Sequence, residues 1–400
     1  MDEDCPHHYK IGQEGATLNV ESRCYMRIEF YRHNITDADI DQAQKVLKGI
    51  FLTTGEEVGE FEKAFAAYLG AKACIGVMSC TAALHLSLLA YGVGPGDEVI
   101  TTPMTFIATA NTILHAGARP VFVDVEPATG CIDPALIEKA VTPSTRAILP
   151  VHLYGQMCDI IAIKRIAGSR NLKVIEDCAH AIECSRDGIR PGQLGDAACF
   201  SFYATKNITC GEGGAVTVNS EEVAEKIRLL RQHGMTKNAS ERHSSRYEHW
   251  DMELLGWKCN MNNLQAALLI GQLGRIEKLL ARRENIAGRY EDAFSKMEGI
   301  SFPKVPENSK SARHLFTIWV DPARRDDILR ALQKVGIGVT VNYRAIHLLK
   351  YYRERFGFKK GIYPIAERIG DSTITLPLYP KLTDKEVEYI IKTVRKVIAR

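Results

Sequence analysis

The chain has 400 residues, of which 46% are apolar and 25% are charged, the mix of a globular protein long enough for two domains. Lysine and arginine number 51 against 48 aspartates and glutamates, and this balance gives no reason to expect nucleic acid or a membrane surface as a partner. No run of 18 apolar residues occurs, no apolar stretch follows the acidic start, and the 11 cysteines form no C-x-x-C pair, so we expect a cytoplasmic protein with reduced thiols and no metal site.

Residues 1–25 are polar and irregular, and we expect them to form a disordered tail. Two helices are predicted next, one from the N-cap Thr36 to Lys48 and one from Val58 to Tyr68. Seven short apolar runs follow, most of them separated by helical stretches: Ala73–Met78, Glu98–Thr102, Pro120–Val125, Ala147–His152, Lys173–Glu176, Ala197–Phe202 and Gly214–Val218. This alternation predicts an α/β domain with a mostly parallel, seven-stranded sheet covered by helices.

The pattern changes near residue 285, so we predict a large domain over residues 26–285 and a smaller C-terminal α/β domain over residues 286–400. A long helix is expected just before this boundary, and further elements after it: a helix at Leu264–Arg282, strands at Leu315–Val320 and Gly338–Val341, and a helix at Asp326–Val335. The last helix begins at the capping box from Thr383 to Glu386.

Ligands of parallel sheets bind beyond the carboxyl ends of the strands, which directs attention to Lys206, just after the run that ends at Phe202. Making a free lysine neutral at pH 7 costs about 4–5 kcal/mol, and burial or cationic neighbours lower that cost. An isolated loop lysine is usually solvated. The residues that accompany Lys206 therefore have to decide between a solvated and a catalytic lysine.

Three further strand ends carry residues of possible chemical use. Asp177 ends a buried run, where a carboxylate either pairs with an arginine or caps a helix, or else meets the protonated pyridine nitrogen of pyridoxal phosphate (PLP). The Ser79-Cys-Thr-Ala82 segment begins a helix whose backbone N–H groups can bind a phosphate. Phe106 follows another strand end, where it can stack on a flat ring or simply belong to the core.

Taken together, these residues resemble the DegT-like sugar aminotransferases of the PLP fold type I, or aspartate aminotransferase, superfamily. The resemblance extends from about residue 26 to residue 400. Its motifs are Thr53-Thr54-Gly55, Ser79-Cys-Thr-Ala-Ala83, Pro103-Met-Thr-Phe106, Pro150-Val-His-Leu-Tyr-Gly155, Glu176-Asp-Cys-Ala-His180, Ser201-Phe-Tyr-Ala-Thr-Lys206-Asn-Ile-Thr209, Gly211-Glu-Gly-Gly214, Ala345-Ile-His347 and Leu376-Pro-Leu-Tyr-Pro380.

The resemblance implies a role for each residue around the cofactor ring. Lys206 would form a Schiff base with PLP and later move protons, and Asp177 would pair with the pyridine nitrogen. His180 stands where the family places a residue near the phenolic oxygen, and Phe106 would stack on the ring.

The resemblance also implies how the phosphate is held. Thr81, Ala82 and Ser201 would bind it from one subunit. Asn260 would reach it from a neighbouring subunit, so a homodimer with shared active sites is expected. Cys80 replaces a glycine that is common in the family, which leaves the local backbone geometry less defined.

The implied reaction moves an amino group, with glutamate as the donor, to a 4-keto sugar on a nucleoside diphosphate. Lys258 and Arg344 are candidate contacts to the substrate's charged diphosphate. His347 either faces the sugar or is a structural histidine. Lys258 and Asn260 replace the usual Asn and Arg of this motif, a pair that resembles the branch making 4-amino sugars.

Three rival functions stay open at this point. The family's PLP-dependent or PMP-dependent sugar dehydratases carry a histidine in place of the Schiff-base lysine, so Lys206 argues against them. Aminotransferases for 3-keto sugars or aminocyclitols tend to carry Ser-Arg-Leu-Asp-Glu where this chain has Cys259-Asn-Met-Asn-Asn263. A silent regulatory homologue would not need an intact Lys206 and Asp177.

Overall fold

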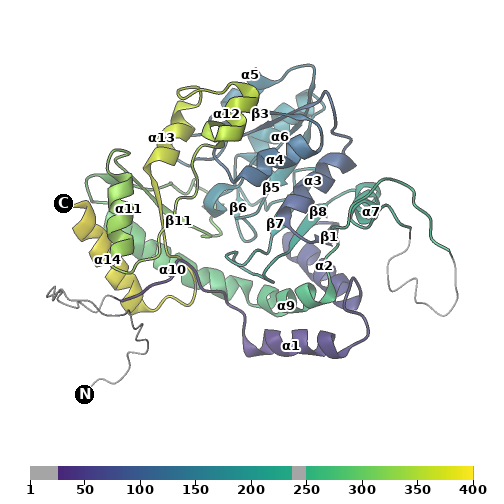
Figure 1. Ribbon diagram of the computed structural model, residues 1–400, viewed down its shortest axis with the longest axis horizontal. Helices are drawn as coiled ribbons and strands as arrows, with labels where there is room; N and C mark the ends of the chain where they lie inside the picture. Colours follow the sequence, from purple (N-terminus) through teal and green to yellow (C-terminus); the bar gives the residue numbers. More distant parts are fainter. Residues whose placement is uncertain (1–25, 237–248, 400) are drawn as a thin grey trace, which may run out of the picture.

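The computed structural model describes residues 26–236 and 249–399, so the predicted tail lies outside the described residues (Figure 1). All seven apolar runs form strands of one sheet, in the order β1-β8-β7-β5-β4-β2-β3. The bounds of the strands are β1 Ala73–Val77, β2 Glu98–Thr101, β3 Arg119–Phe122, β4 Thr145–Ile148, β5 Lys173–Asp177, β7 Ala197–Ser201 and β8 Gly214–Val218. The predicted fold class, a seven-stranded, mostly parallel sheet, is therefore confirmed.

Strand direction decides where a site can form. β8 runs antiparallel to both of its neighbours, and the remaining strands are parallel to one another. The carboxyl ends of β1, β2, β5 and β7 consequently meet at one edge of the sheet. This is the edge at which parallel sheets bind ligands.

Helices cover both faces of the sheet, because side chains alternate along each strand. In β5, Val174 packs into the core formed with α2, α5, α6 and α9, whereas Ile175 packs into the core formed with α3, α4 and α7. In β7, Phe200 and Cys199 repeat the same alternation. These helices span α2 Glu56–Leu69, α3 Cys80–Ala90, α4 Ile107–His115, α5 Pro134–Ala140, α6 Ile160–Ser169, α7 Glu221–Leu230 and α9 Asn263–Gly274.

A third core is built mainly from the C-terminal part of the chain, around a three-stranded sheet of order β12-β11-β9. Ile28 belongs to this core and forms an isolated bridge with Ile337. The predicted capping box of the last helix is present, with Thr383 and Glu386 bonded reciprocally. The elements here are α10 Ile276–Phe294, β9 Ile300–Ser301, β11 Phe316–Val320, α11 Arg325–Lys334, β12 Thr373–Leu376 and α14 Asp384–Ile398. The division near residue 285 falls inside α10, and we retain it as a proposal.

The remaining elements are short or lie at the periphery. α1 packs beside α9, as Figure 1 shows. These elements are α1 Asp37–Lys48, η1 Leu153–Gly155, β6 Ser185–Arg186, β10 Ser309–Lys310, η2 Ile346–Leu348, α12 Lys350–Phe356 and α13 Pro364–Ser372. Across the described residues, no helix combines the length and the apolar character that crossing a bilayer requires.

Two predicted elements were wrong. The single helix at 264–282 is two helices, α9 and α10, which meet at Arg275 after the poor helix former Gly274. The guanidinium of Arg275 is bound to the carboxylate of Asp39 in α1, which holds the break in place. The strand at 338–341 is a loop, because Gly338 donates its N–H to Ile28 O instead of joining a continuous ladder.

Candidate active site

A cavity of about 570 Å³ opens at the carboxyl edge of the large sheet. Six of the residues expected at the cofactor line it: Thr81, Phe106, Asp177, His180, Ser201 and Lys206. Residues from the N-terminal segment and from the loop before η2 complete its wall: Phe30, Thr340, Asn342 and Tyr343. The strand ends thus bring together side chains that are far apart in the sequence.

Lys206 lies in the turn that follows β7, where its backbone N–H donates to Tyr203 O at 2.9 Å. Burial lowers the pKa of its amine to about 8, and the nearby Cys80 and Asp177 offset part of that decrease. At pH 7 the amine is therefore mostly charged, but its neutral fraction is far larger than that of a free lysine. An amine with such a pKa is suited to nucleophilic attack and to proton transfer.

Asp177 ends β5 with its carboxylate facing the cavity. One carboxylate oxygen accepts from Thr109 Oγ1 at 2.8 Å and the other from the Ala179 N–H at 3.1 Å. Within the described residues it forms no ion pair, and burial raises the pKa of its carboxyl group. A cation bound in the cavity beside it would stabilise its charged form.

His180 is a neutral imidazole whose tautomer is set by the backbone. The Tyr154 N–H donates to Nδ1 at 3.2 Å, so the proton resides on Nε2, which lies 3.1 Å from Tyr343 Oη and donates to it. Burial, assisted by the charge of Lys206, lowers the pKa of His180 well below its ordinary value. The Tyr343 hydroxyl proton is consequently free to donate elsewhere.

Phe106 presents its ring to the cavity and is 54% exposed. Its centroid lies 5.8 Å from that of Tyr343. Sequence reasoning missed both Tyr343 and Asn342, because they lie in the loop that was predicted to follow a strand. The only sequence signal was their position just before the Ala345-Ile-His347 motif. Asn342 Oδ1 is buried without a hydrogen-bond partner among the described residues.

The start of α3 forms part of the cavity wall. Thr81 is exposed there, whereas the Ala82 N–H already donates to the N-cap Ser79 Oγ at 3.1 Å and Ala82 does not line the cavity. Gly214 at the start of β8 approaches this helix so closely that a Cβ would lie 2.4 Å from Ser79 C. The absence of a side chain at Gly214 therefore allows the backbone of β8 to pack against the N-terminus of α3.

Besides Ala82, four predicted site residues do not line the cavity in this chain. Asn260 donates from Nδ2 to Thr54 Oγ1 at 2.8 Å, and its expected role requires a second subunit. Lys258 is exposed, and Arg344 is 61% exposed with Asp371 4.0 Å away. His347 is fully buried and its Nε2 lies 3.0 Å from Glu367 Oε1.

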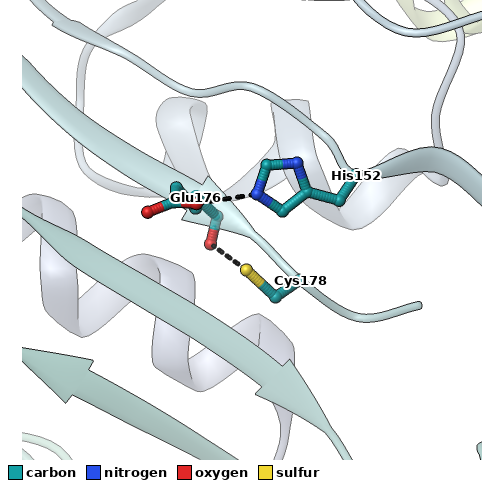
Figure 2. Close-up of side chains that lie close together, drawn as sticks. All are labelled: His152, Glu176 and Cys178. Atoms are coloured by element: carbon teal, nitrogen blue, oxygen red, sulfur yellow. Dashed lines mark hydrogen bonds and ion pairs between the residues drawn. The ribbon is translucent and has the colours of Figure 1, made fainter. Parts of the chain in front are cut away.

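One group among the described residues has the side-chain types of a metal site, with donor atoms of His152, Glu176 and Cys178 within 4.8 Å of one another (Figure 2). Each of these potential ligand atoms already takes part in a hydrogen bond. His152 Nε2–H donates to Glu176 Oε2 at 2.7 Å, since Nδ1 accepts from the Cys158 N–H. Cys178 Sγ bonds Glu176 O at 3.6 Å. This group cross-links the ends of β4 and β5 and needs no ion.

The cavity fits a flat, phosphorylated pyridine. A buried carboxylate without an ion pair faces it, an amine with a lowered pKa lies in it, and an exposed aromatic ring forms part of its wall. Ser201 and Thr81 also line the cavity, and both carry hydroxyl groups that can donate to a phosphate. These are the groups that PLP requires of a protein.

Comparison with known proteins shows which family this chain resembles. The model of the DegT/DnrJ/EryC1/StrS aminotransferase family matches residues 33–395. The spore coat polysaccharide biosynthesis protein SpsC of Bacillus subtilis is 45% identical over 366 residues, which cover 90% of this chain and 94% of that protein. GDP-perosamine synthase of Caulobacter vibrioides is 38% identical over 354 residues, which cover 86% of this chain and 91% of that protein.

Solved structures agree with these relatives. Spr1654 of Streptococcus pneumoniae, described as a sugar aminotransferase, has a TM-score of 0.88 in its PMP form at 34% identity, covering 93% of this chain and 99% of that one. The PLP form of the same protein gives a TM-score of 0.87. The protein is an enzyme, a sugar aminotransferase whose cofactor is PLP, and the chain belongs to the DegT/DnrJ/EryC1/StrS aminotransferase family.

Proposed function

We propose that this enzyme transfers an amino group from glutamate to the 4-keto carbon of a sugar attached to a nucleoside diphosphate. The observation that carries the proposal is the single cavity that holds Lys206 and Asp177 together. Lys258 and Asn260 support the 4-keto position, because this pair resembles the branch that makes 4-amino sugars. The name of the Caulobacter relative, GDP-perosamine synthase, supports a nucleotide-linked sugar.

When bound, PLP supplies an electron sink for the carbon next to the transferred nitrogen. Asp177 would hold a proton on the cofactor's ring nitrogen, since a cation there relieves the cost of its buried carboxylate. Lys206 would attach the cofactor, and its amine, once released, would move a proton between the two carbons that flank the transferred nitrogen, which a pKa of about 8 permits near neutral pH. His180 would stand beside the phenolic oxygen, and its Nε2–H would hold Tyr343 Oη so that the tyrosine hydroxyl can donate toward that oxygen.

Basic side chains outside the cavity are the proposed contacts to the diphosphate. Lys258 and Arg344 are both exposed, and the nearest carboxylate to Arg344 is as far as 4.0 Å. Both cations can therefore exchange water for phosphate oxygens at little cost. His347 is not part of this proposal, since its buried contact with Glu367 favours a structural role.

We propose a homodimer in which Asn260 of each chain reaches the other chain's phosphate site. Apolar side chains along α1 and the turn after it support an interface there: Ile40, Leu47 and Ile50, the last of them 89% exposed. A cytoplasmic location is proposed as well. The free thiols of the described residues favour it.

A substrate panel tests the proposal. The purified enzyme is given glutamate and, in turn, nucleotide-linked 4-keto sugars, 3-keto sugars and an aminocyclitol precursor, and the amino product is identified by mass and NMR. Transfer to 4-keto sugars at least about tenfold faster in kcat/KM than to the others is expected. Preference for a 3-keto sugar would replace the proposal with its nearest rival.

The same panel separates transfer from dehydration. Borohydride reduction should attach the cofactor to Lys206, which peptide mapping can locate. Loss of a sugar hydroxyl without gain of nitrogen would instead point to a dehydratase. A label on any residue other than Lys206 would remove the central assignment.

A further inference from the structure

A buried polar network starts at the residue next to Lys206. Asn207 Nδ2 donates to Glu183 Oε2 at 2.7 Å and to Ala312 O at 3.1 Å. Both partners are acceptors, so the amide oxygen faces the other way, toward His314 Nδ1 at 3.0 Å. His314 Nδ1 must therefore carry a proton and donate it to Asn207 Oδ1.

The charge of this network is balanced inside the protein. Arg283, from α10, forms an ion pair with Glu183, and both side chains are enclosed. Arg283 Nε also donates to Ala312 O at 3.3 Å. Asn207 is consequently held between a neutralised carboxylate and an imidazole, with no freedom to turn.

The network then reaches His180 through ring contact. The centroids of the His314 and His180 rings are 4.5 Å apart, at an interplanar angle of 40°. With its proton on Nδ1, His314 is a neutral imidazole, as His180 is. Burial lowers the pKa of His314 well below its ordinary value, and the charge of Lys206 adds to this effect.

Several separate segments meet in this network. Glu183 follows β5 and His180, Asn207 follows β7 and Lys206, and His314 precedes β11. The network thus fixes the turn that bears Lys206 against the segment that bears His180. It also links both to α10, through Arg283.

We propose that Asn207 and His314 are positioning residues for Lys206. They hold the lysine's turn against the segment that bears His180, in the position that leaves the Lys206 side chain only partly exposed at the cavity wall, and Asn207 fixes the tautomer of His314. Loosening this turn would expose the amine further to water and return its pKa toward the ordinary value of a lysine. The inference rests on the proposed attachment of PLP to Lys206.

Matched substitutions at His314 separate this role from general stability. In His314→Asn the side-chain NH2 lies near the former Nδ1 and can still donate to Asn207. In His314→Gln the same group lies near the former Nε2 and cannot. His314→Leu removes the donor altogether. Tyr290→Phe is the control, because it removes one buried hydrogen bond, to Pro377 O, from the same helix as Arg283.

The measurement is the rate at which the full-length apoenzyme forms its Lys206-linked absorbance band with PLP, as a function of pH. We expect His314→Leu and His314→Gln to raise the pH midpoint of this rate by about one unit and to slow attachment at pH 7 about tenfold. His314→Asn should restore the wild-type midpoint. Tyr290→Phe should lower the melting temperature without moving the midpoint.

The outcomes are distinguishable. If the Asn and Gln variants share the wild-type midpoint, the positioning role is refuted, even if His314→Leu fails to fold. A midpoint shift in Tyr290→Phe equal to that of the Gln variant would refute it too. If the wild-type protein forms no band linked to Lys206, the proposed function fails instead.

Discussion

Glu176 and Asp177 are consecutive residues of β5, and their side chains point to opposite faces of the sheet. Glu176 is enclosed: one of its oxygens accepts from His152, as Figure 2 shows, and the other accepts from the Gly192 N–H. Asp177 faces the cavity with its charge uncompensated by any ion pair of the described residues. One carboxylate is enclosed by protein atoms and its neighbour lines the cavity.

The difference teaches that burial by itself does not identify a functional carboxylate. Both side chains are almost inaccessible to solvent. Each carboxylate accepts one hydrogen bond on each oxygen, so what separates them is that Asp177 lines a cavity able to hold a cation, whereas Glu176 does not. Substituting Asp177 should therefore reduce activity more than stability, and substituting Glu176 should do the reverse.

The largest expected effect is on the cavity side. Asp177→Asn should lower kcat/KM by about 100- to 1000-fold, because an amide cannot hold a proton on the cofactor nitrogen. The apoenzyme should melt at the same temperature as the wild type or higher, since a costly buried carboxylate is gone. Kinetics and calorimetry of the same preparation check both halves. A destabilised Asn variant with normal activity would reverse the comparison.

Lys206 extends the comparison to a cation. Because burial lowers its pKa to about 8, the folded apoenzyme binds this proton less tightly than the unfolded chain does. The resulting penalty is full below pH 8 and vanishes as the pH rises above the unfolded lysine's pKa. Lys206→Met should stabilise the apoenzyme by roughly 1–3 kcal/mol at pH 7. Denaturant titrations should show that the gain disappears above about pH 10.5.

Glu176→Gln tests the enclosed carboxylate on the other side of β5. Glutamine offers one acceptor where two donors converge, so either the His152 N–H or the Gly192 N–H would face an NH2 group. We expect a loss of about 1–3 kcal/mol in the free energy of unfolding. The kcat of the folded enzyme should change less than about fivefold. Unchanged stability would mean that the group can rearrange its protons at no cost.

The smallest effect is expected from Thr109→Val, which removes the hydroxyl that donates to Asp177. That hydrogen bond favours the charged carboxylate, so its loss should raise the pKa of Asp177. Activity should fall about three- to tenfold, more on the acid side of the pH profile. A serine at this position retains the hydroxyl and should recover most of the activity.

The sequence was informative where chemistry follows a strand. Each of the seven apolar runs became a strand, and Asp177, Ser201 and Lys206 follow or end theirs at the same edge, because parallel strands align their carboxyl ends. Tyr343 and Asn342 could not be found this way. They reach the cavity from a loop whose position depends on the packing of the third core, which no local pattern reports.

Hydrogen-bond partners were equally hidden. The Thr81-Ala82 segment was expected to offer its N–H groups, yet the Ser79 side chain accepts from one of them. His347 carried a family motif, but its surroundings depend on Glu367, twenty residues further on. The break at Arg275 depends on Asp39, more than two hundred residues away. Pairings over such distances are properties of the folded chain.

Ile28 gives the molecule a particular order of assembly. It is among the first described residues, yet it is buried in the core that also contains Ile398 near the other end. During synthesis all seven strands of the large sheet leave the ribosome before α14 does. The segment around Ile28 has to wait for that helix before it can dock. Completing this core therefore requires synthesis to have passed α14.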